Sequence, residues 1–318
     1  MTIPRHSSMP IDRKDWYKSR MSTPDPRNDR DYVLGTHDAE VERLGFQHSI
    51  WREEVLRAWM EAGIGLGSRV VDIGAGPGFA SLDLAELVGP TGSVLATERS
   101  GRFLKLLTAE ARRRGLPTIE TCEIDLMHDA IPLQGVYGSP IDGARRGSTG
   151  FDAAWCRWVA CFVSDPALLV KRISAALRPG GAAIFHEYVE YGSYQLLPPR
   201  HEAKEFIEAV SESWRAGGGE PNIARVLPKM LVDAGFELKS LRPIARAART
   251  TDPLWNWPAG FMRINVPRMV ELGVRSEAWG RSVLGALDEA ERDPASIFIT
   301  PTVLEIIAIK RPTLPIQR

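Results

Sequence analysis

Between residues 63 and 190, short apolar runs alternate with segments that have the periodicity of amphipathic helices. The segments of helical period predict helices at 78–88, 101–114 and 166–177. The apolar runs predict buried strands at 69–73, 93–97, 120–124, 152–156 and 182–187. Strands that alternate with helices are typical of an α/β fold with a mostly parallel, doubly wound (Rossmann-like) sheet.

The chain before this region divides into two parts. Residues 1–31 are rich in proline, serine and charge, and they predict a mobile tail. Residues 32–62 form a helical pattern, in which Trp51, Val55 and Trp59 recur at helical spacing before Gly63. We expect this segment to act as a helical lid, which precedes one domain over 63–318.

The alternation stops after Glu187. Residues 188–234 are predicted to be largely helical, and apolar runs at 236–241 and 303–309 predict two late strands. We expect these strands to form a terminal antiparallel hairpin that completes a seven-stranded sheet. Insertions at about 188–234 and 243–296 would then cover the substrate. A Gly/Ser-rich loop is predicted at 134–150.

Composition narrows the possible classes of protein. The chain has 318 residues, of which 44% are hydrophobic and 25% charged, with 40 basic and 40 acidic side chains. This balance gives no general attraction to nucleic acid, and the short basic cluster 112–114 fits a solvated helix face. No run of 18 apolar residues is present, so we expect no membrane span. The first 30 residues lack the apolar stretch of a signal peptide, so we expect none.

The three cysteines, Cys122, Cys156 and Cys161, lack the number and spacing of a disulfide framework or a zinc site. We therefore expect a reduced, cytoplasmic protein that is a monomer or a homodimer.

The most informative segment is Val70–Phe79, VVDIGAGPGF, in which a buried strand runs into a glycine turn and a helix. Glycines allow close approach of a ligand to the backbone, and the N-terminus of the helix presents N–H groups. A dinucleotide fingerprint requires G-x-G-x-x-G, whereas Phe79 occupies the sixth position here and Pro77 lacks an N–H. Asp72 stands two places before the first glycine.

This segment resembles motif I of the class I S-adenosylmethionine (SAM)-dependent methyltransferases, of the bacterial small-molecule type. Four later segments match the family in order. They are Leu95–Glu98 at the end of the second strand, Ile124–Leu126 after the third, Phe151–Arg157 as the fourth, and the turn Leu177–Gly181 before the fifth.

The resemblance implies that SAM is bound and S-adenosylhomocysteine released. Glu98 would accept hydrogen bonds from the ribose hydroxyls, Asp125 would bind the adenine amino group, and Asp72 would face the methionine amine. For Asp72, a carboxylate that only braces the loop is an equally good interpretation. The full implied cofactor site is Tyr32, Gln47, Asp72, Gly74, Ala75, Gly76, Gly78, Glu98, Arg99, Asp125, Leu126 and Arg157.

Aromatic residues at such spacing more often belong to a core than to a pocket. Their concentration in the predicted insertions, together with residues after the fourth strand, nevertheless indicates an acceptor pocket. The candidates are His48, Trp158, Tyr188, Tyr191, Trp255, Trp257 and Phe261. His186 and Glu187 are candidate general bases, of which strand alternation sends only one toward the cofactor. A structural role is the alternative for either. Because the fourth strand lacks the aspartate of metal-dependent relatives, we expect no metal.

The sequence thus predicts a metal-independent SAM-dependent methyltransferase acting on a small, partly apolar acceptor, with methylation of oxygen favoured over nitrogen or carbon. We expect no nucleic-acid partner. The alternative is a non-catalytic SAM- or nucleotide-binding protein of the same fold.

Overall fold

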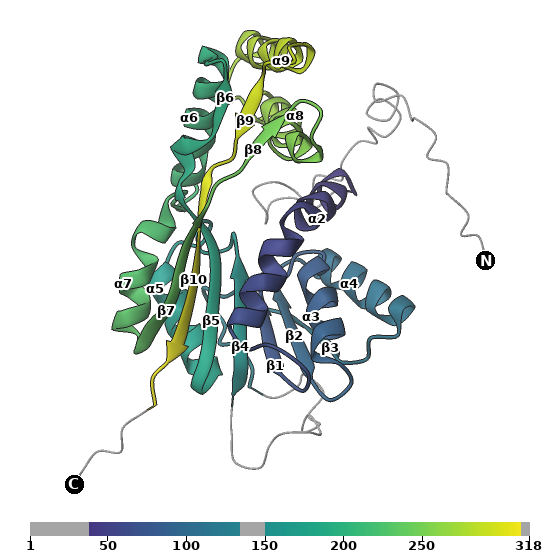
Figure 1. The fold of residues 1–318 in the computed structure, drawn as a ribbon, viewed down its shortest axis with the longest axis vertical. Helices are drawn as coiled ribbons and strands as arrows, with labels where there is room; N and C mark the ends of the chain where they lie inside the picture. The colour runs from purple at the N-terminus through teal and green to yellow at the C-terminus, as the bar shows by residue number, and fades with distance from the viewer. Residues whose placement is uncertain (1–37, 134–149, 313–318) are drawn as a thin grey trace.

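The computed structural model describes residues 38–133 and 150–312. Seven strands form the main sheet in the order β3-β2-β1-β4-β5-β10-β7 (Figure 1). Neighbouring strands from β3 to β5 pair in parallel, whereas β10 is antiparallel to both β5 and β7. The bounds are β1 Arg69–Ile73, β2 Ser93–Glu98, β3 Ile119–Glu123, β4 Phe151–Arg157, β5 Leu177–Glu190, β7 Phe236–Ile244 and β10 Thr302–Lys310. The predicted doubly wound sheet with a terminal antiparallel hairpin is confirmed.

Two groups of helices flank this sheet. In the first group, α2 (Asp38–Glu61) packs beside α3 (Phe79–Val88), which in turn contacts α4 (Gly101–Arg114). In the second group, α5 (Pro166–Ala176) packs against α7 (Leu227–Asp233). The predicted tail 1–31 and most of the predicted loop 134–150 lie outside the described residues.

The upper part of the molecule in Figure 1 is a second layer, which we call the cap. Its three-stranded sheet has the order β6-β9-β8, and each strand continues one strand of the main sheet, in the matching order β5-β10-β7. The cap comprises β6 Gln195–Leu197, α6 His201–Ala216, β8 Ala247–Arg249, α8 Asn256–Glu271, α9 Glu277–Arg292 and β9 Ile297–Ile299. Single 3-10 turns lie at Tyr191–Ser193, Ile223–Arg225 and Pro253–Trp255.

The start of the first insertion differs from its helical prediction. Strand β5 continues to Glu190, and β6 follows after one 3-10 turn. β6 is only three residues long and pairs with Ile297–Ile299, about a hundred residues away in sequence. A local pattern carries no signal for such a pairing.

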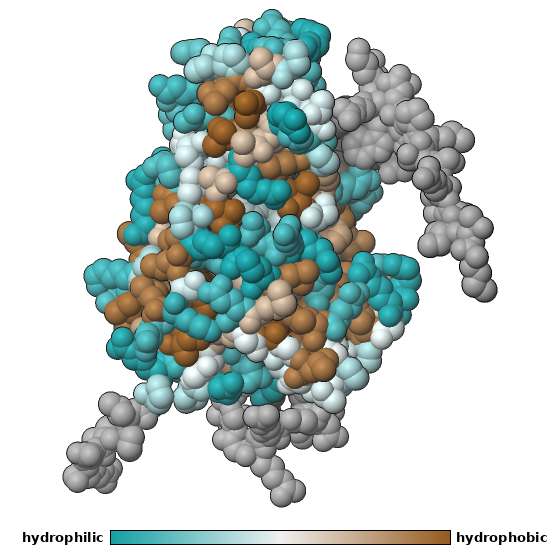
Figure 2. Space-filling view, in the orientation of Figure 1, coloured by the Kyte–Doolittle hydropathy of each residue, from teal (hydrophilic) through white to brown (hydrophobic). Residues whose placement is uncertain are grey.

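Helix α2 packs on the sheet through a row of apolar side chains. Trp51, Val55 and Trp59 are buried, and Trp59 meets Trp155 of β4 edge to face at 5.5 Å between ring centroids. The outward face of α2 is mostly hydrophilic (Figure 2). The helix therefore forms one wall of the fold, while its action as a lid stays a prediction.

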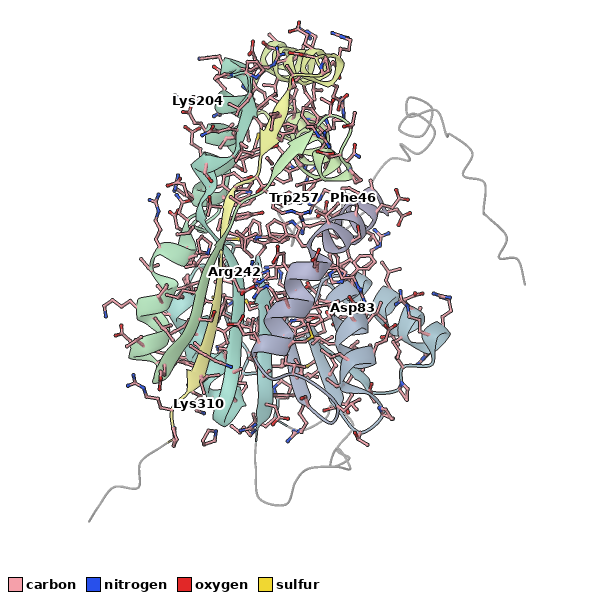
Figure 3. All side chains as sticks on the ribbon, viewed as in Figure 1. Phe46, Asp83, Lys204, Arg242, Trp257 and Lys310 are labelled. Carbon is pink, nitrogen blue, oxygen red and sulfur yellow. The ribbon has the colours of Figure 1, made fainter. Side chains whose placement is uncertain are left out.

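A buried carboxylate ties α2 to the late strands. Glu305, in the middle of β10, is fully buried and lies 2.9 Å from Nε2 of His186 on β5. It also pairs with Arg57 of α2 and with Arg242 of β7 (Figure 3), and Arg242 in turn pairs with Glu54 of α2. Burial opposes ionisation of Glu305, but the hydrogen bonds from His186 and Arg57 outweigh it and lower its pKa to about 2.

We expect Glu305→Ala to lower the free energy of unfolding by at least about 2 kcal/mol, because the buried N–H of His186 loses its acceptor and a cavity opens. Urea unfolding at neutral pH measures the change. The matched control is Glu61→Ala, which removes a half-exposed partner of the same Arg57 and should cost less than about 0.5 kcal/mol. Equal losses in the two variants would contradict a special role for the buried carboxylate.

Candidate active site

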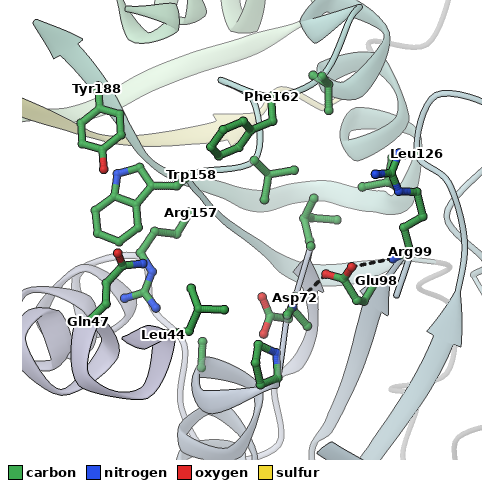
Figure 4. Close-up of a pocket in the computed structure, with 18 of the residues that line it drawn as sticks. Leu44, Gln47, Asp72, Glu98, Arg99, Leu126, Arg157, Trp158, Phe162 and Tyr188 are labelled. Carbon is green, nitrogen blue, oxygen red and sulfur yellow. Dashed lines mark hydrogen bonds between the residues drawn. The ribbon is translucent and has the colours of Figure 1, made fainter. Parts of the chain in front are cut away.

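A cavity of about 450 Å³ opens at the carboxyl ends of the parallel strands. The strand order reverses between β1 and β4, which is where open α/β sheets bind ligands. The cavity is walled by the loops after β1, β2, β3 and β4, by the first half of α2, and by residues of the cap (Figure 4). It has one end lined by polar residues and another lined by aromatic rings.

The glycine loop after β1 forms the floor of the polar end. Gly74 and Gly76 have φ values of 63° and 57°, in the left-handed region that favours glycine. A Cβ atom at Gly74 would lie 2.5 Å from Val159, whereas at Gly76 no atom lies within 4 Å. The loop therefore leaves open space beside Gly76 for a ligand. Gly78 does not line the cavity, because its missing side chain makes room for Leu107 of α4.

Glu98 ends β2 directly beside this loop. One carboxylate oxygen accepts the N–H of Gly76 at 2.9 Å, and the other accepts the N–H groups of Arg99 and Ser100, both at 2.9 Å. A carboxylate has about four lone-pair sites and three of them are used here, so one site, on the oxygen that accepts the Gly76 N–H, remains for a further donor. Glu98 holds the glycine loop in place and can accept one more hydrogen bond from a ligand hydroxyl.

Two other acids line the polar end. Asp72 is buried and accepts a 2.6 Å hydrogen bond from Ser81, but burial raises its pKa to about 7. A cationic ligand group nearby would favour its ionised form. Asp125 sits in a turn after β3, where its carboxylate accepts the N–H of Met127 at 2.8 Å, and it lines the cavity together with Leu126 and Arg99.

The aromatic end is organised around Trp158, the residue after β4. Its φ of 51° is a left-handed conformation that costs a bulky residue of order 1–3 kcal/mol. The indole stacks on Tyr188 at 5.6 Å and on Trp257 of α8 at 5.8 Å. Gln47 of α2 accepts the indole N–H of Trp257 at 2.9 Å. Side chains from the sheet, α2 and the cap therefore form one aromatic wall, to which Tyr191 and Phe261 also belong.

Several predicted residues lie outside the cavity lining. His186 belongs to the buried network of Glu305. Glu187 is buried and accepts the backbone N–H groups of Val159 and Ala160, both at 2.7 Å, so that it braces the turn after β4. The two side chains point to opposite faces of the sheet, and both faces of β5 are covered by protein at this point, so neither side chain faces the cavity. These positions do not support either as the general base.

Two predicted acceptor residues also differ from expectation. Trp255 packs on Phe298 at 4.4 Å inside the cap, away from the cavity. His48 lies behind the wall, between Asp83 and Arg157. Tyr32 lies outside the described residues. The other predicted cofactor and acceptor residues line the cavity: Gln47, Asp72, Gly74, Ala75, Gly76, Glu98, Arg99, Asp125, Leu126, Arg157, Trp158, Tyr188, Tyr191, Trp257 and Phe261.

The lining residues that the sequence did not single out include Phe162, Trp214 and Pro301. Trp214 shares the apolar face of α6 with Phe206 and Val210 at helical spacing, so its pattern matches that of a core residue. Pro301 lies at the junction between β9 and β10, and only the folded sheet brings that junction to the site.

The described residues contain no cluster of three or more histidine, cysteine or acidic side chains that could hold a metal ion. Over the same part of the chain, every helix is too short or too polar to cross a membrane.

A glycine loop, an acid at the end of the second strand and a cavity at the switch point are the features expected of a SAM-dependent methyltransferase. Residues 65–235, more than half of the chain, match the family described as a methyltransferase domain. The chain belongs to this family.

Two curated relatives differ in how much they share with this chain. The demethylmenaquinone methyltransferase of Lactococcus lactis is 26% identical, with 69% of this chain and 74% of the relative covered. The 23S rRNA (uracil(1939)-C(5))-methyltransferase RlmD of Psychrobacter arcticus is 35% identical over 125 residues. That match covers 36% of this chain and only 24% of the relative.

Among solved structures, the YcgJ protein of Bacillus subtilis aligns with a TM-score of 0.53 at 15% identity. The alignment covers 82% of this chain and 100% of that one. At this level of identity the likeness concerns the fold alone.

We expect Glu98→Gln to weaken the binding of S-adenosylhomocysteine by about 1.5–3 kcal/mol, because the charged acceptor of the ribose hydroxyls becomes a neutral amide. Isothermal titration calorimetry measures the affinity. Glu123→Gln is the matched control, since Glu123 pairs with Glu98 in the register of β2 and β3 but does not line the cavity. An unchanged affinity in folded Glu98→Gln protein would remove Glu98 from the cofactor site.

Proposed function

We propose that this methyltransferase acts on a small, planar, partly apolar acceptor and transfers the methyl group to an oxygen atom without a metal ion. The observation that carries the proposal is the stack of Tyr188, Trp158 and Trp257, which faces the glycine loop across one cavity. Flat aromatic walls favour flat ring ligands by stacking. The name of the Lactococcus relative, which specifies a quinone, supports an acceptor of this shape.

In this proposal each end of the cavity binds one of the two reactants. Glu98, Asp125 and the glycine loop would hold SAM at the polar end, and SAM supplies a methyl group that is already activated on a sulfonium. The aromatic end would hold the acceptor ring among the aromatic side chains that line it. The protein's main contribution is then to align the two reactants, an effect worth up to about 7–11 kcal/mol in well-oriented reactions.

The residues around the acceptor offer little basic capacity. The acids and the imidazole that line the cavity, Asp72, Glu98, Asp125 and His128, belong to the loops of the polar end. At the aromatic end, burial raises the pKa of the Tyr188 and Tyr191 hydroxyls above the usual tyrosine value. These tyrosines remain protonated at neutral pH. The site therefore suits an acceptor whose own hydroxyl ionises readily.

The test is an incubation of the protein with SAM carrying a ¹³C-methyl group and a panel of hydroxylated naphthoquinones, naphthols and phenols. We expect a methoxy signal in the product by NMR, with undiminished turnover after EDTA treatment and no gain from added magnesium. A ring-methyl signal would assign the transfer to carbon instead. Turnover that is lost with EDTA and restored by a divalent ion would contradict the metal-independent proposal.

Binding of S-adenosylhomocysteine without a methylated product from any member of the panel would favour the alternative, a non-catalytic SAM-binding protein. Titration with NAD is the matched negative control, because the loop carries Phe79 where a dinucleotide site requires a small residue.

A further inference from the structure

Arg157 occupies the boundary between the polar and the aromatic end of the cavity. It ends β4 and lines the cavity, and its guanidinium lies 5.2 Å from the Trp158 ring and 5.9 Å from the Trp155 ring (Figure 4). Within the described part of the chain, it forms no ion pair with a carboxylate, and its enclosed Nη1 has no hydrogen-bond partner. Its positive charge is thus only partly compensated.

His48 and Asp83 hold this guanidinium from behind. Nε2 of His48 lies 3.1 Å from Asp83, and Nδ1 lies 3.1 Å from Nη2 of Arg157. Burial lowers the pKa of His48, against the opposing effect of Asp83. A neutral ring with its proton on Nε2 satisfies both contacts, since Nε2 donates to Asp83 and Nδ1 accepts from Arg157. Arg52 anchors Asp83 at 2.6 Å.

Among the residues that the structure describes, no carboxylate forms an ion pair with the guanidinium of Arg157. Burial lowers the pKa of Arg157 to about 10, which leaves it protonated at neutral pH. Asp72, an acid of the cavity lining that interacts electrostatically with Arg157, is itself buried and bonded to Ser81. Bound SAM would add a sulfonium charge to the same cavity. A partly buried cation without a close anion favours a negative partner in the cavity.

We propose that Arg157 binds an ionised oxygen of the acceptor, a phenolate, enolate or carboxylate on a planar ring, and that this contact selects acidic acceptors. This inference rests on the proposed function and assigns the chemical class of its substrate. The family resemblance implied a cofactor contact for Arg157. The proposal instead makes Arg157 the specificity-determining residue of the aromatic end, and His48 and Asp83 are positioning residues that act through it.

The proposed contact accounts for the absence of a base among the described residues that line the aromatic end. The acceptor loses its proton to water before or during binding, and Arg157 stabilises the resulting anion. The anion forms the new bond to the methyl carbon, while the electron pair of the breaking S–C bond stays on sulfur. A sulfonium and an anion become a neutral thioether and a neutral methylated product, so no further proton transfer is required.

The carboxylate of the methionine part of SAM has the same chemistry as an acidic acceptor, and the test must separate the two. The acceptor is favoured because Arg157 lies against Trp158, on the side of the aromatic stack, with Asp72 on its other side (Figure 4).

The experiment compares 2-naphthoate with 2-naphthamide, which share ring, size and shape but differ in charge. Their affinities are measured by calorimetry in the presence of saturating S-adenosylhomocysteine. We expect the wild-type protein to bind 2-naphthoate at least tenfold more tightly than the amide. Arg157→Gln should abolish this preference, Arg157→Lys should retain part of it, and both should bind S-adenosylhomocysteine within about twofold of wild type.

The control variant is Arg263→Gln, which removes a cation of the cap that pairs with Asp288 and Glu291 and does not line the cavity, and it should leave the naphthoate preference intact. His48→Leu, which keeps Arg157 but removes the acceptor of its Nη2, should reduce the preference less than Arg157→Gln does.

Equal binding of the two probes by wild type would overturn the inference while leaving the proposed function standing. A loss of S-adenosylhomocysteine affinity in Arg157→Gln with an unchanged probe preference would assign Arg157 to the methionine carboxylate, and the inference would also fail. If neither probe binds the wild-type protein, both the inference and the planar-acceptor proposal fall.

Discussion

The carboxylate of Glu305, buried at the centre of β10, imposes a constraint that the surrounding elements must meet. A charge removed from water needs close partners, and Glu305 finds them on β5, α2 and β7. Arg57 and Glu54 thereby lock the second half of α2 against the late strands. Gln47 lies ten residues before Arg57, about 15 Å along the helix axis at 1.5 Å per residue. At that distance it lies beside the cap, where it accepts a hydrogen bond from Trp257.

Trp158 contacts side chains of the main sheet, of α2 and of the cap, the same parts of the molecule that depend on the position of Glu305. Its left-handed backbone is unfavourable for an indole-bearing residue, yet its N–H donates to the His186 carbonyl at 3.0 Å and its ring stacks with Tyr188 and with Trp257. Trp51 of α2 adds edge contacts to both tryptophans of this stack. The strain is therefore offset by packing from three parts of the chain, and the result is a rigid, flat wall beside the cofactor loop.

The fold by itself does not select the acceptor, since related sheets carry many chemistries. Selection depends on side chains that the cap and α2 bring over the sheet. Arg157 shows this clearly, because the same residue type on a surface strand would be a solvated charge. Here it is enclosed by Trp158, His48 and the aromatic stack, where an unbalanced charge has a large effect on what can bind.

The sequence by itself determined the sheet, the glycine loop and the acid behind it, because hydrophobic period, glycine conformation and strand-end position are local properties. The residue pattern placed Gly74 and Gly76 in the loop, and the family resemblance that this pattern carries pointed to Glu98; all three line the cavity. The directions of His186 and Glu187 were decided only by tertiary structure, since both faces of β5 are covered and neither side chain reaches the cavity. Likewise, β6 and β9 pair across about a hundred residues, and Trp214 and Pro301 reach the site only in the folded protein. Long-range contacts of this kind depend on which surfaces bury each other, and a local pattern of residues does not encode that choice.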